Sequence, residues 1–407
     1  MADAQLQRPR WGHKTSLFQW NQPALYLYGL FVIGSFALVS LEQAALSSLS
    51  PGGWLLSWFL LAIVGVPMFI LIYRLDLYER EPLSLVFGAL IWGGIAAIAL
   101  ASLANVGWLL FLLTSQGPEF TSEWGAAIVA PFTEETIKGA GVVLLYLIAR
   151  DEFDDMLDGF VYGAVVGLGF MLVEDVFYFV ANFGGTTEGV LKGFALRVIA
   201  SGLYGHVLYT ALTGMGVAYF TSRTGRVPLG QRLLVAIGLF LIGVVGHFLW
   251  NSPLLDFFPD DPFASAGAFL QTLFAAAVKG VPLLLFVALL VKLAHRREHR
   301  WLEAALAGEV GQPGLTQEEW EQLRTPRSRR RARAEMRRRA GTRGAAVLHR
   351  LQRQQINLAM IATRVDGDHP DLLRQREYCR SLRDYIAGLP GARPPASTGA
   401  GPPATAP

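Results

Sequence analysis

Charged side chains occur inside long apolar stretches of this sequence, where such groups are rare in proteins. One stretch contains EETIK, in which Glu134 and Glu135 precede Lys138 by four and three residues. On a helix these spacings bring both carboxylates beside the ammonium, which can partly neutralise them. The next stretch contains FMLVED, with Glu174 and Asp175. Two successive apolar stretches therefore carry carboxylates that a lipid environment disfavours.

Imidazole and amide groups occur in the two stretches that follow. His206 lies in GHVLYT, and His247 precedes Asn251 by four residues in HFLWN, so the latter two share a helix face. Each group alone has an ordinary explanation, since a single histidine often bonds a neighbouring helix and a Glu–Lys pair is often structural. Four successive stretches with such groups favour one shared polar site, because mutual contacts then offset the cost of burial.

These residue types suit the activation of water. Adjacent glutamates supply a general base, imidazoles and an amide supply hydrogen-bond donors, and sets of Glu and His bind zinc. The single cysteine, Cys379, lies in the polar C-terminal part, and no serine in a GxSxG context has a histidine partner in these stretches. A proton-coupled transporter and a noncatalytic membrane scaffold remain as alternatives, because Glu/His chains also form proton relays.

The elements that carry these residues are predicted to be membrane-spanning helices. The chain of 407 residues is 52% hydrophobic and only 16% charged, whereas about 25% is usual for soluble proteins. Apolar runs of roughly 20 residues, the length that crosses a bilayer, occupy residues 24–46, 54–73, 83–104, 124–149, 157–183, 194–220, 231–251 and 269–293. We therefore predict an all-α, polytopic membrane helix bundle with about eight transmembrane helices.

The sequence divides into four predicted segments. These are a cytoplasmic N-terminus (1–23), a transmembrane peptidase domain (24–293), a cytoplasmic basic helical tail (294–389) and a disordered Pro/Ala-rich tail (390–407). Lys and Arg residues cluster in alternate loops, which predicts a multi-pass protein of the cell membrane with both termini in the cytoplasm. Nine arginines lie between Arg324 and Arg339, and we expect them to contact anionic lipid rather than nucleic acid.

Taken together, the motifs resemble those of a known family. EETIK (Glu134–Lys138), FMLVE (Phe170–Glu174), the separate His206, and HFLWN (His247–Asn251) resemble the EExxK, FxxxE and His motifs of PrsW-type intramembrane proteases. That family is related to CAAX prenyl proteases and bacteriocin-processing proteins. The resemblance covers roughly residues 24–293. It implies a polytopic peptidase that cuts membrane-bound proteins, such as anti-sigma factors, near the bilayer surface.

The resemblance and the residue chemistry together assign roles. Glu134 or Glu135 is expected to be the base, Lys138 their counter-ion, and Asn251 a donor to the oxyanion. We expect three further residues either to bind a metal such as Zn²⁺ or, without metal, to act as acid and donor groups. These are Glu174, His206 and His247. The sequence lacks the HExxH helix that would decide for zinc.

Helix rise predicts that the site groups lie at similar depths in the membrane. Glu134 would lie about 15 Å below the outer surface, with the others in the outer half or near the midplane. We expect the side chains of Glu134, Glu174, His206 and His247 to converge within about 10 Å and to open to the extracytoplasmic side. Lys279, in the last run, is expected either to neutralise the carboxylates of the fifth run or to extend toward the headgroups.

Overall fold

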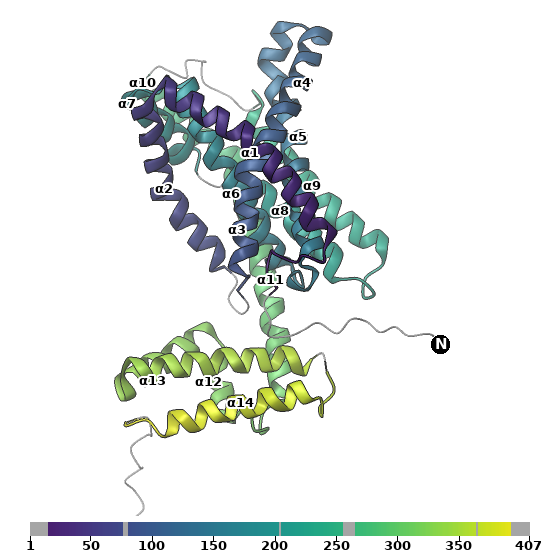
Figure 1. Ribbon diagram of the computed structural model, residues 1–407, viewed down its shortest axis with the longest axis vertical. Helices are drawn as coiled ribbons and strands as arrows, with labels where there is room; N and C mark the ends of the chain where they lie inside the picture. Colours follow the sequence, from purple (N-terminus) through teal and green to yellow (C-terminus); the bar gives the residue numbers. More distant parts are fainter. Residues whose placement is uncertain (1–14, 76–79, 203–204, 255–264, 364, 392–407) are drawn as a thin grey trace, which may run out of the picture. The chain divides into compact units, whose positions relative to one another are not determined.

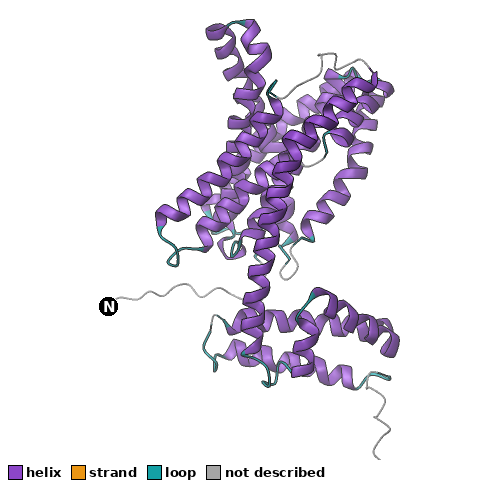
Figure 2. Ribbon diagram, turned by 180° about the vertical axis from the view of Figure 1, so that it is seen from behind, coloured by secondary structure: helices purple, strands orange, loops and turns teal. Residues whose placement is uncertain are grey.

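The fold is built from helices, as predicted (Figures 1 and 2). The computed structural model describes residues 15–75, 80–202, 205–254, 265–363 and 365–391, and no strand occurs among them. The chain forms two compact units. Within the described residues, one unit runs from Thr15 to His295 and the other from Arg296 to Gly391.

The first unit contains the predicted membrane-spanning segments. Six helices in the described residues are long and apolar enough to cross a membrane. They are α1 (Pro23–Leu49), α2 (Pro51–Tyr73), the continuous helix of α3 (Leu83–Ile91), η1 (Trp92–Ala97) and α4 (Ile98–Gln116), the helix of α6 (Met156–Phe177) and η3 (Tyr178–Asn182), α9 (Leu229–Asn251), and the helix of α10 (Ser265–Ala275), η5 (Ala276–Gly280) and α11 (Val281–Ala307). The elements η1, η3 and η5 are π-helical turns, which are frequent at functional sites.

The two other predicted segments correspond to more polar helices. Segment 124–149 becomes α5 (Pro118–Ile148), which carries EETIK and forms with α4 a hairpin that extends beyond the other helices of the unit (Figure 1). Segment 194–220 is not one helix, so that prediction is wrong. It is divided between one helix, formed by α7 (Thr187–Phe194) and η4 (Ala195–Ala200), and the separate α8 (Gly205–Ser222).

A turn of the backbone explains this division. Gly202 has φ of 77°, a left-handed conformation that glycine adopts at little cost but that does not continue a right-handed helix. Sequence hydropathy does not detect such a turn, because apolar residues predominate on both sides of it. The turn places Arg197 and His206 on two different helices, η4 and α8.

Glycines bring α6 and α8 into close contact. Gly159, Gly163 and Gly167 recur every fourth residue on one face of α6, where a Cβ would lie 2.1–2.3 Å from backbone oxygens of α8. For Gly167 that oxygen is the carbonyl of His206, at 2.2 Å. Small residues at this spacing allow helix backbones to approach closely. The glycine face of α6 therefore fixes the position of His206 relative to the α6 carboxylates.

The second unit folds around its own small core. Its helices are the end of α11, α12 (Gln317–Leu323), α13 (Pro326–Ala362) and α14 (Pro370–Ala387). Leu358, Leu372 and Cys379 are fully or almost fully buried between α13 and α14. Two ion pairs join α14 to the segments before α13. Arg376 contacts Glu309, in the turn after α11, at 2.8 Å, and Arg383 contacts Glu319 of α12 at 2.7 Å. The basic tail is thus a folded helical unit.

One side of α13 carries an exposed row of arginines, which we call the arginine face. It consists of Arg327, Arg330, Arg331, Arg337 and Arg338. At 100° per residue these side chains fall within an arc of about 120°. The opposite side is used for packing, because Arg329 is buried and Ala332 and Met336 pack against the core. The first half of α13 is therefore amphipathic, with arginine as its polar surface.

Candidate active site

The centre of the candidate site is a group of ion pairs on α5. The Nζ atom of Lys138 lies 3.1 Å from Oε2 of Glu134 and 2.9 Å from Oε1 of Glu135. The Lys138 side chain is entirely buried, with 0% exposure. Its ammonium also contacts the face of Phe170, 3.7 Å from the ring centroid. The predicted pairing of EETIK is therefore present, and the FxxxE phenylalanine packs on the same ammonium.

His206 of α8 joins this group and links it to α6. Its Nδ1 atom lies 2.8 Å from Nζ of Lys138, and its Nε2 atom lies 3.1 Å from Oε2 of Glu174. An ammonium only donates hydrogen bonds, so Nδ1 accepts and the ring proton is on Nε2, which donates to Glu174. A carboxylate on the second nitrogen of a histidine fixes its tautomer and orientation. Glu174 thus holds His206 with its Nδ1 lone pair directed at the site.

Glu174 is in turn held by an arginine that the predicted site did not include. Arg197 of η4 donates through Nη2 to Oε2 of Glu174 at 2.8 Å and through Nε to Oδ1 of Asp175 at 2.6 Å. Its guanidinium lies 3.6 Å from the ring centroid of Tyr178. Three neighbouring residues of the α6–η3 helix therefore contact one cation. The cation that neutralises these two carboxylates is therefore Arg197.

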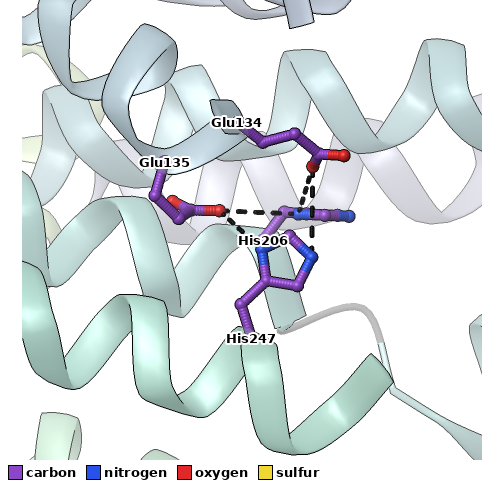
Figure 3. Close-up of side chains that lie close together, drawn as sticks. All are labelled: Glu134, Glu135, His206 and His247. Atoms are coloured by element: carbon purple, nitrogen blue, oxygen red, sulfur yellow. Dashed lines mark hydrogen bonds and ion pairs between the residues drawn. The ribbon is translucent and has the colours of Figure 1, made fainter. Parts of the chain in front are cut away.

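His247 of α9 completes the cluster from the opposite helix (Figure 3). Its Nδ1 atom lies 3.1 Å from Oε1 of Glu135, and its Nε2 atom lies 4.0 Å from Oε2 of Glu134. The ring stacks on Tyr209, with 5.0 Å between centroids and 11° between planes. A carboxylate accepts hydrogen bonds, so Nδ1 is the donor and the Nε2 lone pair faces Glu134.

Two neutral side chains that sequence reasoning missed orient the glutamates. Asn105 of α4 donates from Nδ2 to Oε1 of Glu134 at 3.2 Å and itself accepts from the Thr133 hydroxyl. Thr210 of α8 donates to Oε2 of Glu135 at 2.9 Å. Each glutamate therefore has one oxygen fixed by a neutral donor and the other directed at Lys138. An amide within an apolar run was the available signal for Asn105, whereas a threonine in a span gives almost none.

The donor set and the charge of the site fit a divalent cation. Glu134, Glu135, His206 and His247 each offer one ligand atom, and these atoms all lie within 4.8 Å of one another. Oxygen and imidazole ligands in this combination suit Zn²⁺. Four carboxylates of the described residues contact Lys138 or Arg197, namely those of Glu134, Glu135, Glu174 and Asp175. With neutral histidines, four negative and two positive groups leave two negative charges, which one divalent ion would balance.

The remaining predicted residues lie around this centre. Glu174 is not among the four clustered ligands, because it contacts the other nitrogen of His206. Asn251 lies one turn after His247, and its amide is 3.5 Å from the carbonyl oxygen of Ala126 on α5. Lys279 is buried and donates to the carbonyl of Ser252 at 2.8 Å. The structure therefore brings Glu134, Glu174, His206 and His247 together as predicted, although their catalytic roles remain predictions.

Comparison with known proteins gives a single family. Residues 81–295 match the family described as PrsW family intramembrane metalloprotease. Protease PrsW of Geobacillus kaustophilus (strain HTA426) is 29% identical over 196 residues, which cover 48% of this chain and 72% of that protein. Protease PrsW of Bacillus subtilis (strain 168) is 24% identical over 194 residues, covering 47% and 73%. No solved structure matches the chain significantly.

Proposed function

Because the chain belongs to the PrsW family of intramembrane metalloproteases, we propose that it hydrolyses membrane-bound proteins with the Glu134–Glu135–His206–His247 cluster. The observation that carries this proposal is the convergence of two carboxylates and two imidazoles from α5, α8 and α9 on a buried spot. Family membership sets aside the transporter and the noncatalytic scaffold, because the relatives are named proteases.

We assign Glu135, His206 and His247 as the residues that would hold the metal, with Zn²⁺ as the expected ion. Three protein ligands and an open position are typical of catalytic zinc. A bound Zn²⁺ would polarise the scissile carbonyl and lower the pKa of a bound water. Glu174 holds the Nε2–H of His206 and so presents the Nδ1 lone pair to the ion, which is the usual arrangement behind a metal-bound histidine.

Glu134 is then the general base. Among the described residues it has the smaller number of hydrogen-bond partners, since Oε1 accepts from Asn105 and Oε2 accepts from Lys138. Both oxygens of Glu135 are occupied, by Lys138 and His247 on one side and Thr210 on the other. The Glu134 side chain also retains 5% exposure, while that of Glu135 has none. Asn251 remains our choice for the oxyanion donor.

Separate glutamine substitutions test these assignments. Glu134→Gln should keep its zinc content but lose about 10²- to 10⁴-fold in cleavage rate, the usual contribution of a general base. Glu135→Gln should lose both zinc and cleavage. Glu123→Gln, an exposed position of the same helix, is the matched control and should resemble the unmodified protein. Cleavage of a membrane-anchored reporter protein and elemental analysis are the measurements. Full activity of Glu134→Gln would refute the base assignment, and full zinc content of Glu135→Gln would refute the ligand assignment.

The exposed side of the cluster indicates where water and substrate approach. The side chains of Glu174 and His206 are 16% and 13% exposed, and that of Arg197 is 26% exposed, whereas Lys138 is completely enclosed. We propose that the substrate, a membrane-bound protein such as an anti-sigma factor, enters between η4 and α8. We also retain the predicted cytoplasmic termini, which place the cut in the outer part of the membrane.

We further propose that the arginine face of α13 binds anionic lipid. Its exposed guanidiniums are suited to phosphate groups, and the unit continues directly from the apolar first part of α11, so it is tethered to a bilayer. The full chain in vesicles containing phosphatidylglycerol should show slower hydrogen exchange in α13 than in phosphatidylcholine alone. Arg330→Gln with Arg337→Gln should remove the difference. The matched pair Arg374→Gln with Arg380→Gln on α14 should keep it, and equal exchange in both vesicles would refute the proposal.

A further inference from the structure

We propose that Lys138 is an internal competitor for the metal, whose ammonium must leave its present position before the proposed ligands can bind an ion. This inference rests on the proposed ligand set. It assigns to the EExxK lysine a role in metal occupancy that goes beyond neutralising the glutamates.

The position of the ammonium is the first observation. Its Nζ atom lies 3.1, 2.9 and 2.8 Å from Oε2 of Glu134, Oε1 of Glu135 and Nδ1 of His206. These are the atoms of the cluster that converge from α5 and α8. Three of the four residues that offer ligands are therefore already bonded to a cation.

The lone pair of His206 makes the competition direct. Because the proton of this ring is on Nε2 and donated to Glu174, Nδ1 is the nitrogen that has a lone pair for a metal. That lone pair accepts from Lys138. A metal ion requires the same electron pair at about 2.0–2.1 Å, so His206 cannot bond the ammonium and the ion together.

Charge gives a second reason for exclusion. A divalent ion among the ligands would lie within a few ångströms of the ammonium, in surroundings where Lys138 has no exposure and charges are poorly screened. The ammonium has one further favourable contact, the face of Phe170, which can retain a cation that no longer contacts the carboxylates. The arrangement is therefore a choice between two cations, in which Lys138 sets how tightly the metal is held.

Zinc affinity of purified, full-length variants tests this inference without measuring cleavage. Lys138→Met keeps the length of the side chain and removes the charge, and we expect its zinc dissociation constant to fall by about tenfold or more, measured by competition with a chelator. Lys138→Arg keeps a cation and should show no tightening. Lys279→Met is the matched control, because Lys279 is also a buried lysine of an apolar helix but bonds a backbone carbonyl.

Zinc should also rescue the stability of the neutral variant. Removing the ammonium leaves two carboxylates without their cation, so Lys138→Met and Lys138→Gln should melt at lower temperature and regain more stability from added zinc than the unmodified protein does. Recovery of either variant only when zinc is present during purification supports the inference equally. Failure of zinc to rescue both variants would contradict it.

The outcomes separate this inference from the proposed function. Zinc binding of equal strength in Lys138→Met and the unmodified protein would overturn the competition and leave the ligand set intact. Absence of zinc binding from every protein would overturn both. Tightening in Lys279→Met as large as in Lys138→Met would assign the effect to general charge and would also overturn the specific role of Lys138.

Discussion

Gly167→Ala should displace His206 without changing any residue of the site. The added Cβ would lie 2.2 Å from the carbonyl oxygen of His206, whereas ordinary contacts begin near 3.4 Å, so the α8 backbone must move by roughly 1.2 Å. Overpacking of this kind costs about 1–3 kcal/mol of stability. A displacement of about 1 Å at a catalytic group can reduce the rate by about 10²-fold. We therefore expect a modest loss of stability and a large loss of cleavage.

The assay compares cleavage of a membrane-anchored reporter with thermal unfolding in the same detergent. Gly238→Ala on α9 is the matched control, because a Cβ there meets nothing within 4 Å, and alanine favours a helix by about 1 kcal/mol over glycine. The control should retain its rate and be as stable as, or more stable than, the unmodified protein. Cleavage at the normal rate in Gly167→Ala would refute the claim that close α6–α8 contact positions His206.

Further predictions concern both units. Arg197→Gln leaves Glu174 and Asp175 without their cation and should reduce the free energy of unfolding by about 2–3 kcal/mol. This value is below that for a fully buried pair, because Arg197 is partly exposed. A loss no larger than in the exposed control Arg226→Gln would contradict this prediction. Burial raises the pKa of the Cys379 thiol from its ordinary 9.0 to about 12, so a thiol reagent at pH 8 should label it only after denaturation. The unfolded chain releases this proton near pH 9 and the folded unit does not, so the stability of the tail unit should fall as pH rises above 9, and a pH series of unfolding experiments measures this. Gly341→Ala should destabilise the same unit by about 1–3 kcal/mol in a denaturant titration, since φ of 71° with ψ of −170° is open essentially to glycine alone.

The part of the site that lies on one helix was predictable from the sequence. Helical spacing fixes which side chains share a face, so the contacts of Lys138 with Glu134 and Glu135 followed from EETIK. The convergence of His206 and His247 on these groups was predictable because polar groups buried separately in several apolar helices are energetically unfavourable. Contacts between these groups offset that cost.

Contacts that depend on the path of the backbone were not predictable. The turn at Gly202 carries Arg197 to Glu174 and Asp175, whereas a continuous helix would have left it at the end of a span. The contact of Glu174 with Nε2 of His206 was not predictable for a related reason, since spacing does not reveal which nitrogen of a histidine a carboxylate will contact. Most of the membrane-spanning elements were thus predictable from the length of the apolar runs, whereas the contacts of Arg197 and Glu174 around the site required the structure.

The ion pairs within α5 also bear on how this segment enters the bilayer during synthesis. A translocon samples a helix before its neighbours have emerged, and each charged residue at the centre of a segment opposes insertion by about 2.5–3.5 kcal/mol. Lys138 can reach Glu134 and Glu135 as soon as one turn of α5 exists, so the charges are compensated before α8 and α9 arrive. Exchanging two residues, through Thr136→Lys with Lys138→Thr, preserves hydropathy and breaks these spacings. Glycosylation mapping of the isolated segment should then show poorer insertion, and unchanged insertion would mean that EExxK spacing matters only to the finished site.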